Sequence, residues 1–333
     1  MQASNDWSMS AGGLLAADDI WPAMQCFADQ GQRTAVVTLV GVDGVAPRPT
    51  GAQLAVAEDG RHYGYLSGGC LEKSIALEAV EQIKTGQNRL ERYGRGSKYI
   101  DIRLPCGSGL DLYFDCSIGR DDIAVVRAFQ ERRQPFVIRS DLTPGANARS
   151  TIQRVTGALG TAQSVRDGHM FSRLHVPNLQ VLVIGSGPAA SGIAELASYT
   201  GFTVKVWTND DAMQDAMALR DVEVQRSPSA AAALIRSSDA FTAVVFAFHD
   251  HDFELPLIME ALRADAFYLG ALGSRAVHAQ RLENLRKRGA DSEQLERLKP
   301  SIGLIPGAKS KATLAMGILT DVLAEAKSRG LVA

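Results

Sequence analysis

Apolar positions follow two different patterns along the chain, and the change between them lies near Pro177. From Leu179 onward, short apolar and β-branched runs alternate with stretches whose apolar residues repeat at helical spacing. This alternation is typical of a doubly wound α/β fold around a parallel sheet. It predicts strands at 179–185, 202–208, 222–226, 241–248, 266–273 and 301–307, with helices between them and a final amphipathic helix after the last strand.

The first half mixes strands and helices without a regular βαβ rhythm. Its patterns predict helices at 18–29, 71–84 and 123–132, and strands at 34–40, 52–58, 99–104, 110–116, 135–140, 151–155 and 171–176. We therefore expect an α/β protein of two domains. The first is an N-terminal mixed α/β domain at 14–177, and the second is a Rossmann-like doubly wound parallel-sheet domain at 178–330.

Composition and charge narrow the possible functions. The 333 residues are 46% hydrophobic and 22% charged, and their formal net charge is -2. No global positive field is therefore available to hold nucleic acid or an anionic membrane surface. No apolar run approaches the ~18 residues of a membrane helix, and we expect no secretion signal at the N-terminus. The four cysteines form no CxxC pair, which favours a reducing, cytoplasmic compartment.

Glycine is the residue type whose distribution stands out. The chain has 31 glycines, about 9% of its residues against a typical ~7%. Thirteen of them fall between residues 41 and 119. We expect the chemistry of the first half to lie in these glycine-rich turns.

The segment GSGPAA at 185–190 follows an apolar strand and opens a predicted helix. In that context a GxGxxG-type turn binds phosphate: Gly185 permits the tight turn, and Gly187 lets a phosphate approach the backbone. A bare turn without a ligand is the alternative.

An NAD(P) site would also require an acid after the second strand of this domain, about 20 residues on. The chain has Trp207, Thr208 and Asn209 there, and Asp210 and Asp211 come slightly later, where they can instead begin the next helix. The sequence therefore supports phosphate binding better than NAD(P) binding. An NAD(P)-dependent oxidoreductase stays open as the alternative function.

Two further candidates follow other predicted strands of this sheet. Ser274 and Arg275 open a helix, so a hydroxyl, a helix N-terminus and a guanidinium can together hold an anion. A plain helix cap with a solvated arginine is the alternative. His249 is a candidate ligand contact, and with His251 it could chelate a metal as in a hydrolase, or belong to an ordinary polar loop.

Two cysteines of the first half lie in glycine-rich turns. Cys70, in LSGGCLE, stands at the start of a predicted helix, where the helix dipole favours the thiolate, although a small residue packed in a turn is the alternative. Cys106, in LPCGSG, is the stronger candidate because the amide of Gly107 can face an anion beside it. Arg48, between two prolines, is the candidate cation. We expect Cys116 to be buried on the apolar face of its strand.

Taken together, these motifs resemble the xanthine dehydrogenase accessory protein family (XdhC/CoxI). The matching segments are, in order, APRPTGAQLAV, LSGGCLE, LPCGSG, IGSGPAA, HDHDFELPLI, YLGALGSR and SIGLIPGA, and the resemblance extends from about Leu14 to Glu325. It implies a Rossmann-type second domain. It also implies a function in the maturation of molybdenum hydroxylases: binding the molybdenum cofactor, supporting its sulfuration with a cysteine desulfurase, and inserting it into the apo-molybdoenzyme.

This cofactor carries a phosphate, a flat pterin and a dithiolene-bound molybdenum, so its carrier needs donors for an anion and can use a soft ligand for the metal. The candidate cofactor-binding residues are Cys106, Cys70, Arg48, Gly107, Gly185, Gly187, Ser274, Arg275 and His249, with Cys106 as the candidate molybdenum ligand. We expect a cytoplasmic homodimer that acts as a chaperone rather than an enzyme. The cofactor can be molybdopterin or its dinucleotide form.

Overall fold

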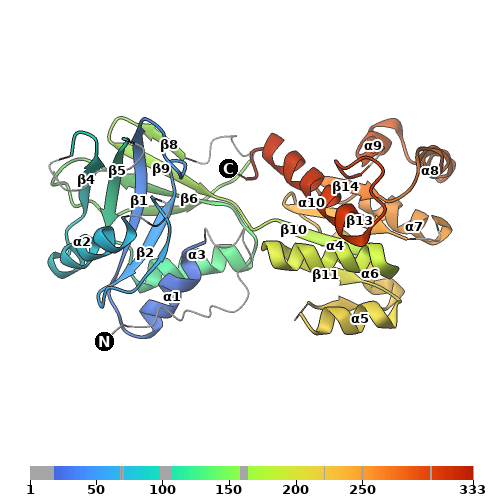
Figure 1. The fold of residues 1–333 in the computed structure, drawn as a ribbon, viewed down its shortest axis with the longest axis horizontal. Coiled ribbons are helices and arrows are strands. Elements are labelled where there is room, and N and C mark those ends of the chain that lie inside the picture. Colours follow the sequence, from blue (N-terminus) through green and yellow to red (C-terminus); the bar gives the residue numbers. More distant parts are fainter. Residues whose placement is uncertain are drawn as a thin grey trace. The chain divides into compact units, whose positions relative to one another are not determined.

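In the computed structural model the chain divides into two compact units, an N-terminal unit that ends at Pro177 and a C-terminal unit that begins at Asn178 (Figure 1). The structure describes residues 19–67, 69, 71–97, 107–157, 164–220, 222–248, 251–300 and 302–332, with the backbone alone of 251 and 252. Each unit has a hydrophobic core of its own.

The C-terminal unit is built on a six-stranded sheet in the order β12-β11-β10-β13-β14-β15. Every recorded pairing between these strands is parallel. This is the strand order of the Rossmann fold, so the predicted doubly wound parallel sheet is confirmed. The strands are β10 (Gln180–Gly185), β11 (Thr203–Trp207), β12 (Val224–Gln225), β13 (Thr242–Ala247), β14 (Tyr268–Ala271) and β15 (Leu298–Lys299).

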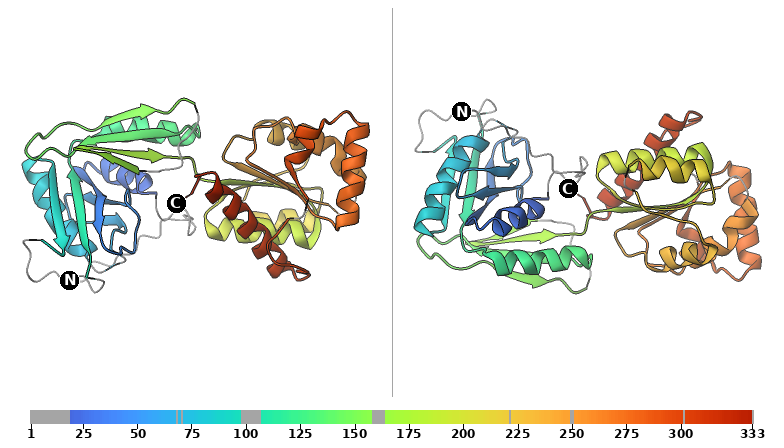
Figure 2. Two further views of the ribbon diagram at one scale, coloured as in Figure 1. Left: turned by 90° about the horizontal axis from the view of Figure 1, so that it is seen from above. Right: turned by 90° about the horizontal axis from the view of Figure 1, so that it is seen from below.

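Helices cover both faces of this sheet (Figure 2). One face carries α4 (Gly187–Thr200), with α5 (Asp211–Ala218) and α10 (Lys311–Ser328) packed against it. The other face carries α6 (Pro228–Arg236), α7 (His251–Ala261), α8 (Arg275–Lys287) and α9 (Ser292–Glu296), and the first three pack in sequence. No helix among the described residues is both long enough and apolar enough to cross a membrane.

The sixth strand lies earlier in the chain than the sequence predicts. It is the two-residue β15, whereas the described part of the predicted strand at 301–307 forms a loop on α10. The amide of Gly303 donates to Asp321 Oδ2 at 3.2 Å, and the amide of Leu304 donates to the Gly317 carbonyl at 3.1 Å. Backbone hydrogen bonds therefore hold this segment on α10, while the Leu304 and Ile305 side chains are exposed.

The N-terminal unit contains a five-stranded antiparallel sheet in the order β3-β2-β1-β5-β4. Its strands are β1 (Thr34–Asp43), β2 (Gln53–Ala57), β3 (His62–Gly64), β4 (Arg89–Gly94) and β5 (Gly109–Asp115). On one face, alternate residues such as Val37, Leu54 and Leu112 form a buried cluster with α2 (Glu72–Thr85). This cluster is the main core of the unit.

A second, four-stranded antiparallel sheet has the order β7-β6-β9-β8. It consists of β6 (Phe136–Asp141), β7 (Thr151–Arg154), β8 (Ser164–Asp167) and β9 (Met170–His175). Val40 and Tyr113 of the first sheet pack against Leu142, which follows β6, and Phe171 of β9. The helices α1 (Trp21–Asp29) and α3 (Arg120–Glu131) pack against each other and complete the unit.

Three strands of this unit, all at sheet edges, have no predicted counterpart. The shortest is β3, with the sequence HYG. The edge strand β4 has the sequence RLERYG, in which only Tyr93 is fully buried, and the edge strand β8 has the sequence SVRD with mostly exposed side chains. Strands at a sheet edge need few apolar residues, so their hydrophobic pattern is weak. The strand predicted at 99–104 lies outside the described residues.

A buried ion pair links two helices of the C-terminal unit. Arg281 Nε lies 2.6 Å from Glu254 Oε1, and the exposed fractions of the two side chains are 1% and 0%. Arg281 Nη2 also donates to the Leu272 carbonyl at 2.7 Å. The pair therefore fixes α7, α8 and the turn after β14 relative to one another.

Removal of one partner of this pair should destabilise the C-terminal unit strongly. We expect Glu254→Ala to lower its unfolding free energy by about 3–5 kcal/mol, because the Arg281 charge stays buried without its carboxylate. Replacement of both residues by Met should restore much of the loss. Hydrogen exchange read by mass spectrometry separates the response of this unit from that of the other.

The matched control is Glu283→Ala, which breaks an exposed ion pair with Lys287 on the same helix. It should change the unfolding free energy by less than about 0.5 kcal/mol. Equal effects of Glu254→Ala and Glu283→Ala would contradict the assignment of a structural role to the buried pair.

Candidate functional site

Three loops emerge from one edge of the five-stranded sheet. Asp43 at the end of β1 pairs with Gly109 at the start of β5, and Gly109 pairs with Gly94 at the end of β4. On the other side of β1, Leu54 near the start of β2 pairs with Gly64 at the end of β3. The connections 44–52, 65–71 and 95–108 therefore all begin at this edge, which we call the loop edge. They are the loops that contain Arg48, Cys70 and Cys106.

The two candidate cysteines of the loop edge, Cys70 and Cys106, lie outside the described residues, as does Gly68. Their neighbours are described. Gly107 has a φ of 65°, and the next residue, Ser108, is buried with its hydroxyl donating to the Val45 carbonyl. This contact ties the end of the 95–108 loop to the start of the 44–52 loop.

Glu72 organises the 65–71 loop from inside. Its carboxylate is buried and accepts hydrogen bonds from the Leu66 and Ser67 amides at 2.9 and 2.8 Å, from the Ser67 hydroxyl at 2.9 Å, and from the Leu71 amide at 3.2 Å. Burial raises the pKa of Glu72, but these hydrogen bonds outweigh burial and hold the pKa below its usual value. One charged group therefore fixes both ends of the loop around Cys70.

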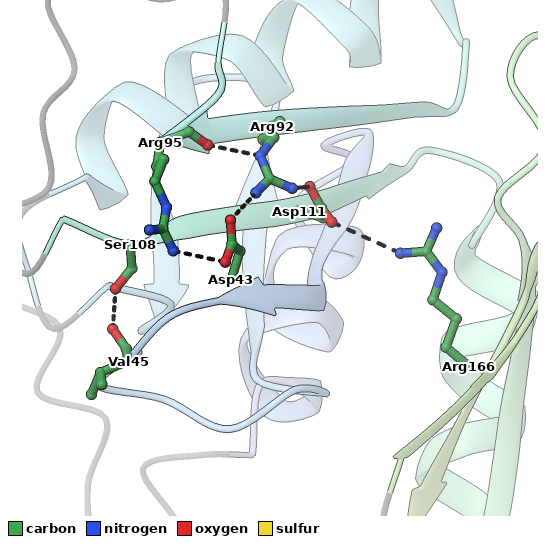
Figure 3. A network of polar contacts seen from close by, with 7 residues as sticks. All are labelled: Asp43, Val45, Arg92, Arg95, Ser108, Asp111 and Arg166. Atoms are coloured by element: carbon green, nitrogen blue, oxygen red, sulfur yellow. Dashed lines mark hydrogen bonds and ion pairs between the residues drawn. The ribbon is translucent and has the colours of Figure 1, made fainter.

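A network of ion pairs occupies the other side of the loop edge (Figure 3). The Arg92 guanidinium bridges Asp111 Oδ1 and Asp43 Oδ2, both at 3.0 Å, and its Nε donates to the Arg95 carbonyl at 2.8 Å. Arg95 Nη2 lies 2.7 Å from Asp43 Oδ1. Arg166 of β8 approaches Asp111 Oδ2 at 3.9 Å, which connects the second sheet to the network. Sequence reasoning missed this network, because its members are scattered from residue 43 to residue 166.

Arg48 is half-buried in the 44–52 loop. The same loop is anchored to the second sheet, since the Thr50 and Ser164 hydroxyls lie 3.0 Å apart and the Ser164 hydroxyl donates to the Thr50 carbonyl at 2.9 Å. Arg48 thus lies on a loop with fixed ends, and its role in binding an anion stays a prediction.

Cys116 is half-buried at the end of the apolar face formed by Leu110, Leu112 and Phe114. Burial, reinforced by the neighbouring Asp115 carboxylate, raises the pKa of its thiol to about 12. The thiol is therefore protonated at neutral pH. Cys116 lies beside the expected apolar face but is less buried than expected.

In the C-terminal unit the glycine turn follows β10. Gly185 lies directly beside β13, and a Cβ at this position would overlap the Ala247 carbonyl, so close packing of the two strands requires glycine here. The Gly187 amide donates to Asp210 Oδ2 at 3.0 Å. Asp210 Oδ1 also accepts from the amides of Ala212 and Met213 and caps α5. The sequence indicated the cap but not the contact with the glycine turn, which folding brings together across 23 residues.

Two of the remaining candidates of this unit, Ser274 and Arg275, lie at the same carboxyl edge of the sheet. Ser274 caps α8, its hydroxyl accepting from the Val277 amide at 3.3 Å, and Arg275 is exposed. The geometry is that of an ordinary helix cap, and binding of an anion there stays a prediction. His249 lies outside the described residues, as does any metal site that includes it. Within the described part of the chain, no group of three His, Cys, Asp or Glu could hold a metal ion.

Sequence reasoning also missed an aromatic cluster beside β11 and β13. The rings of Trp207 and Phe253 stack with their centroids 5.8 Å apart, and the Phe248 ring meets Phe253 edge-on at 5.6 Å. Phe253 is exposed, so the cluster presents an aromatic surface at the edge where ligands of this fold bind. The sequence did contain a signal for this cluster, since Trp207 ends β11 and Phe248 directly follows β13.

Comparison with known proteins gives two matching family models. The model described as the XdhC and CoxI family matches residues 27–94, and the model described as the XdhC Rossmann domain matches residues 181–322. Over 295 residues the chain is 34% identical to the molybdenum cofactor insertion chaperone PaoD of Escherichia coli (strain K12), which covers 88% of this chain and 83% of PaoD. The chain belongs to the XdhC and CoxI family. The resemblance seen in the motifs is therefore confirmed.

Two further similar proteins are more distant. A protein of Bacillus subtilis (strain 168), described as a probable xanthine dehydrogenase subunit, is 22% identical over 331 residues, covering 90% of this chain and 96% of that protein. A crystal structure at 2.80 Å resolution, described as a xanthine dehydrogenase of Bacillus halodurans, has a TM-score of 0.71 at 19% identity and covers 93% of this chain and 96% of that one. At this identity the likeness shows a shared fold alone.

The contacts of Glu72 give a first test of the loop edge. We expect Glu72→Ala to destabilise the N-terminal unit by about 2–4 kcal/mol, because buried amide donors lose their acceptor, and Glu72→Gln to cost less. Since the folded-state pKa of Glu72 lies below its usual value of 4.5, its contribution is present above about pH 4.5 and is lost as the pH falls through the lower folded value. Urea unfolding with hydrogen exchange at 65–72 measures both effects.

Glu81→Ala is the control on the same helix, because Glu81 is exposed and pairs only with Lys84 among its recorded ion pairs in the described residues. It should leave the unfolding free energy unchanged within about 0.5 kcal/mol. If the difference between the wild type and Glu72→Gln stays constant down to pH 3, the charged form of Glu72 does not stabilise the loop.

Proposed function

We propose that this chain is a carrier that binds the molybdenum cofactor, shields it from solvent and inserts it into an apo-molybdoenzyme of the xanthine dehydrogenase type. The 34% identity to PaoD supports the proposal, since PaoD is described as a molybdenum cofactor insertion chaperone. It also favours a carrier over the alternative of an NAD(P)-dependent oxidoreductase. Sulfuration of the cofactor, with a cysteine desulfurase as partner, is part of the same proposal.

The observation that carries the proposal is the convergence of three glycine-rich loops at the loop edge. Cys106 and Cys70 are our candidates for contact with the metal end of the cofactor, with Cys106 as the molybdenum ligand, because thiolate is a soft donor that suits such a metal. Arg48 and the Gly107 amide are the nearby candidates for its anionic groups. Backbone amides and guanidinium groups bind an anion without a large positive field, which fits the near-zero net charge.

The Rossmann sheet supplies a second group of candidates. Gly185, Gly187, Ser274 and Arg275 belong to the carboxyl edge of the sheet, where phosphate groups bind in this fold. His249 is a candidate by its position in the sequence after β13. Any phosphate at the Gly187 amide must first displace Asp210, which now accepts its hydrogen bond. We therefore assign these residues to the nucleotide portion of a dinucleotide form, if that form is the cargo, and the phosphate of the pterin portion to the loop edge.

We further propose that the protein acts in the cytoplasm as a homodimer. Four cysteines without a CxxC pair fit a reducing compartment, where a thiol that receives or contacts a sulfurated cofactor stays reduced. A symmetric dimer is the commonest assembly of soluble proteins that form oligomers. Sedimentation of the purified chain tests the dimer directly.

Copurification from a molybdenum-replete host tests the function. We expect the affinity-purified full chain to carry molybdenum and a pterin, measured by elemental analysis and by the fluorescence of the oxidised pterin. Cys106→Ala should lose most of the molybdenum and should activate the apo-enzyme poorly, because the soft ligand is gone.

Cys26→Ala is the matched control, since Cys26 lies on α1 and outside the glycine-rich loops. It should retain the molybdenum of the wild type. Wild-type protein without molybdenum or pterin would contradict the carrier function, whereas equal retention by Cys106→Ala would remove only Cys106 from the proposal.

A further inference from the structure

Charges alternate in sign along the polar network of the loop edge. In the order of contact they are Arg166, Asp111, Arg92, Asp43 and Arg95, with three cations and two anions (Figure 3). Among the described residues, the network thus ends on a cation at both sides and has one positive charge in excess. One further anion would balance it.

The two ends of the network differ in exposure. Asp43 and Arg95 form the outer pair, and 51% and 57% of their side chains are exposed, whereas Arg92 and Asp111 lie deeper. Ion pairs as exposed as Asp43–Arg95 contribute little to stability, because water competes for both partners. An anion from solution can therefore compete with the Asp43 carboxylate for the Arg95 guanidinium.

The backbone beside this pair packs closely against the Arg95 guanidinium. Gly44 has a φ of 99°, and a Cβ at this position would lie 3.3 Å from Arg95 Nη2 and 3.2 Å from Ser108 Oγ. Glycine thus keeps the surface next to the guanidinium free of a side chain, in a conformation that other residues rarely adopt. The strand ends stay in place without Asp43, because Arg92 also binds Asp111 and the Arg95 carbonyl, and the Arg95 amide donates to the Ser108 carbonyl at 2.9 Å.

We propose that Asp43 is an internal competitor for a phosphate-bearing ligand at Arg95. When the loop edge is empty, the Asp43 carboxylate binds the guanidinium; when the ligand arrives, its phosphate takes that place and Asp43 keeps its contact with Arg92. The inference rests on the proposed function for the identity of the ligand, which is then the phosphate of molybdopterin. The competitor lowers affinity for the cargo, and this suits a carrier that must release what it binds.

Inorganic phosphate tests the competition without any cofactor. We titrate the full-length chain with phosphate at low ionic strength and follow binding by phosphorus NMR. Asp43→Asn removes the competing charge but keeps an oxygen acceptor, and should tighten phosphate binding by about five-fold, while Arg95→Gln should weaken it by about five-fold. The effect of both substitutions should shrink as salt is added.

Asp59→Asn is the matched control. Asp59 forms an ion pair of the same length with Arg61, at 2.7 Å, in the turn between β2 and β3 at the opposite edge of the same sheet. It should leave phosphate affinity unchanged. Circular dichroism shows whether each variant is folded.

Three results would overturn the inference: no phosphate binding by the wild type, unchanged or weaker binding by Asp43→Asn, or equal tightening by Asp59→Asn. The carrier function is judged separately by molybdenum copurification. Phosphate affinities that change as expected in a chain without molybdenum support the competitor and contradict the cargo. A chain that carries molybdenum but fails the phosphate test keeps its function and loses the competitor.

Discussion

Antiparallel pairing around β1 determines where the chemistry of the N-terminal unit can lie. Because β1 pairs with β2 on one side and β5 on the other, segments far apart in the sequence end at one edge. The loops at that edge have no further strand to satisfy their backbone groups, and such groups are costly to leave unpaired when buried. Glu72 and Ser108 supply the missing partners from within. The sheet topology thus determines where the glycine-rich loops lie. The hydrogen bonds of the buried side chains Glu72 and Ser108 fix the loop backbone.

Burial separates the polar groups of this edge into two kinds. Glu72 is enclosed and accepts four hydrogen bonds, so its removal leaves amides unsatisfied and no ligand from solution can replace it. The ion pairs of Asp43 are as short as the hydrogen bonds of Glu72, but the Asp43 side chain is exposed to solvent. A short distance alone therefore does not distinguish a structural carboxylate from an exchangeable one, and solvent exposure does.

The Rossmann sheet could be predicted from the sequence because parallel strands buried on both faces form nearly continuous apolar runs, as β10 and β13 do. The same rule fails for edge strands, which explains why β4 was missed. It also fails for β15, because the apolar segment after this strand forms a loop that is hydrogen-bonded to α10. Single candidates such as Ser274 could be placed from a motif. The network of Asp43 and Arg92 could not be predicted, because its charged residues are distant in the sequence and meet only through the antiparallel pairing of β1, β5 and β4.

In both units a carboxylate of the protein binds a group that is a candidate to bind an anion. The two carboxylates, Asp210 and Asp43, differ in their other contacts. Asp210 binds the Gly187 amide with one oxygen and caps α5 with the other, so an anion at Gly187 must disturb a helix terminus whose cap is worth about 1 kcal/mol. Asp43 caps no helix, and its neighbour Arg92 has contacts with Asp111 and the Arg95 carbonyl that do not depend on it. An incoming phosphate therefore displaces a carboxylate more easily at the loop edge than at the Gly187 amide. Under the function proposed above, this difference favours an order in which the anionic end of the pterin portion binds at the loop edge independently of any rearrangement in the Rossmann sheet.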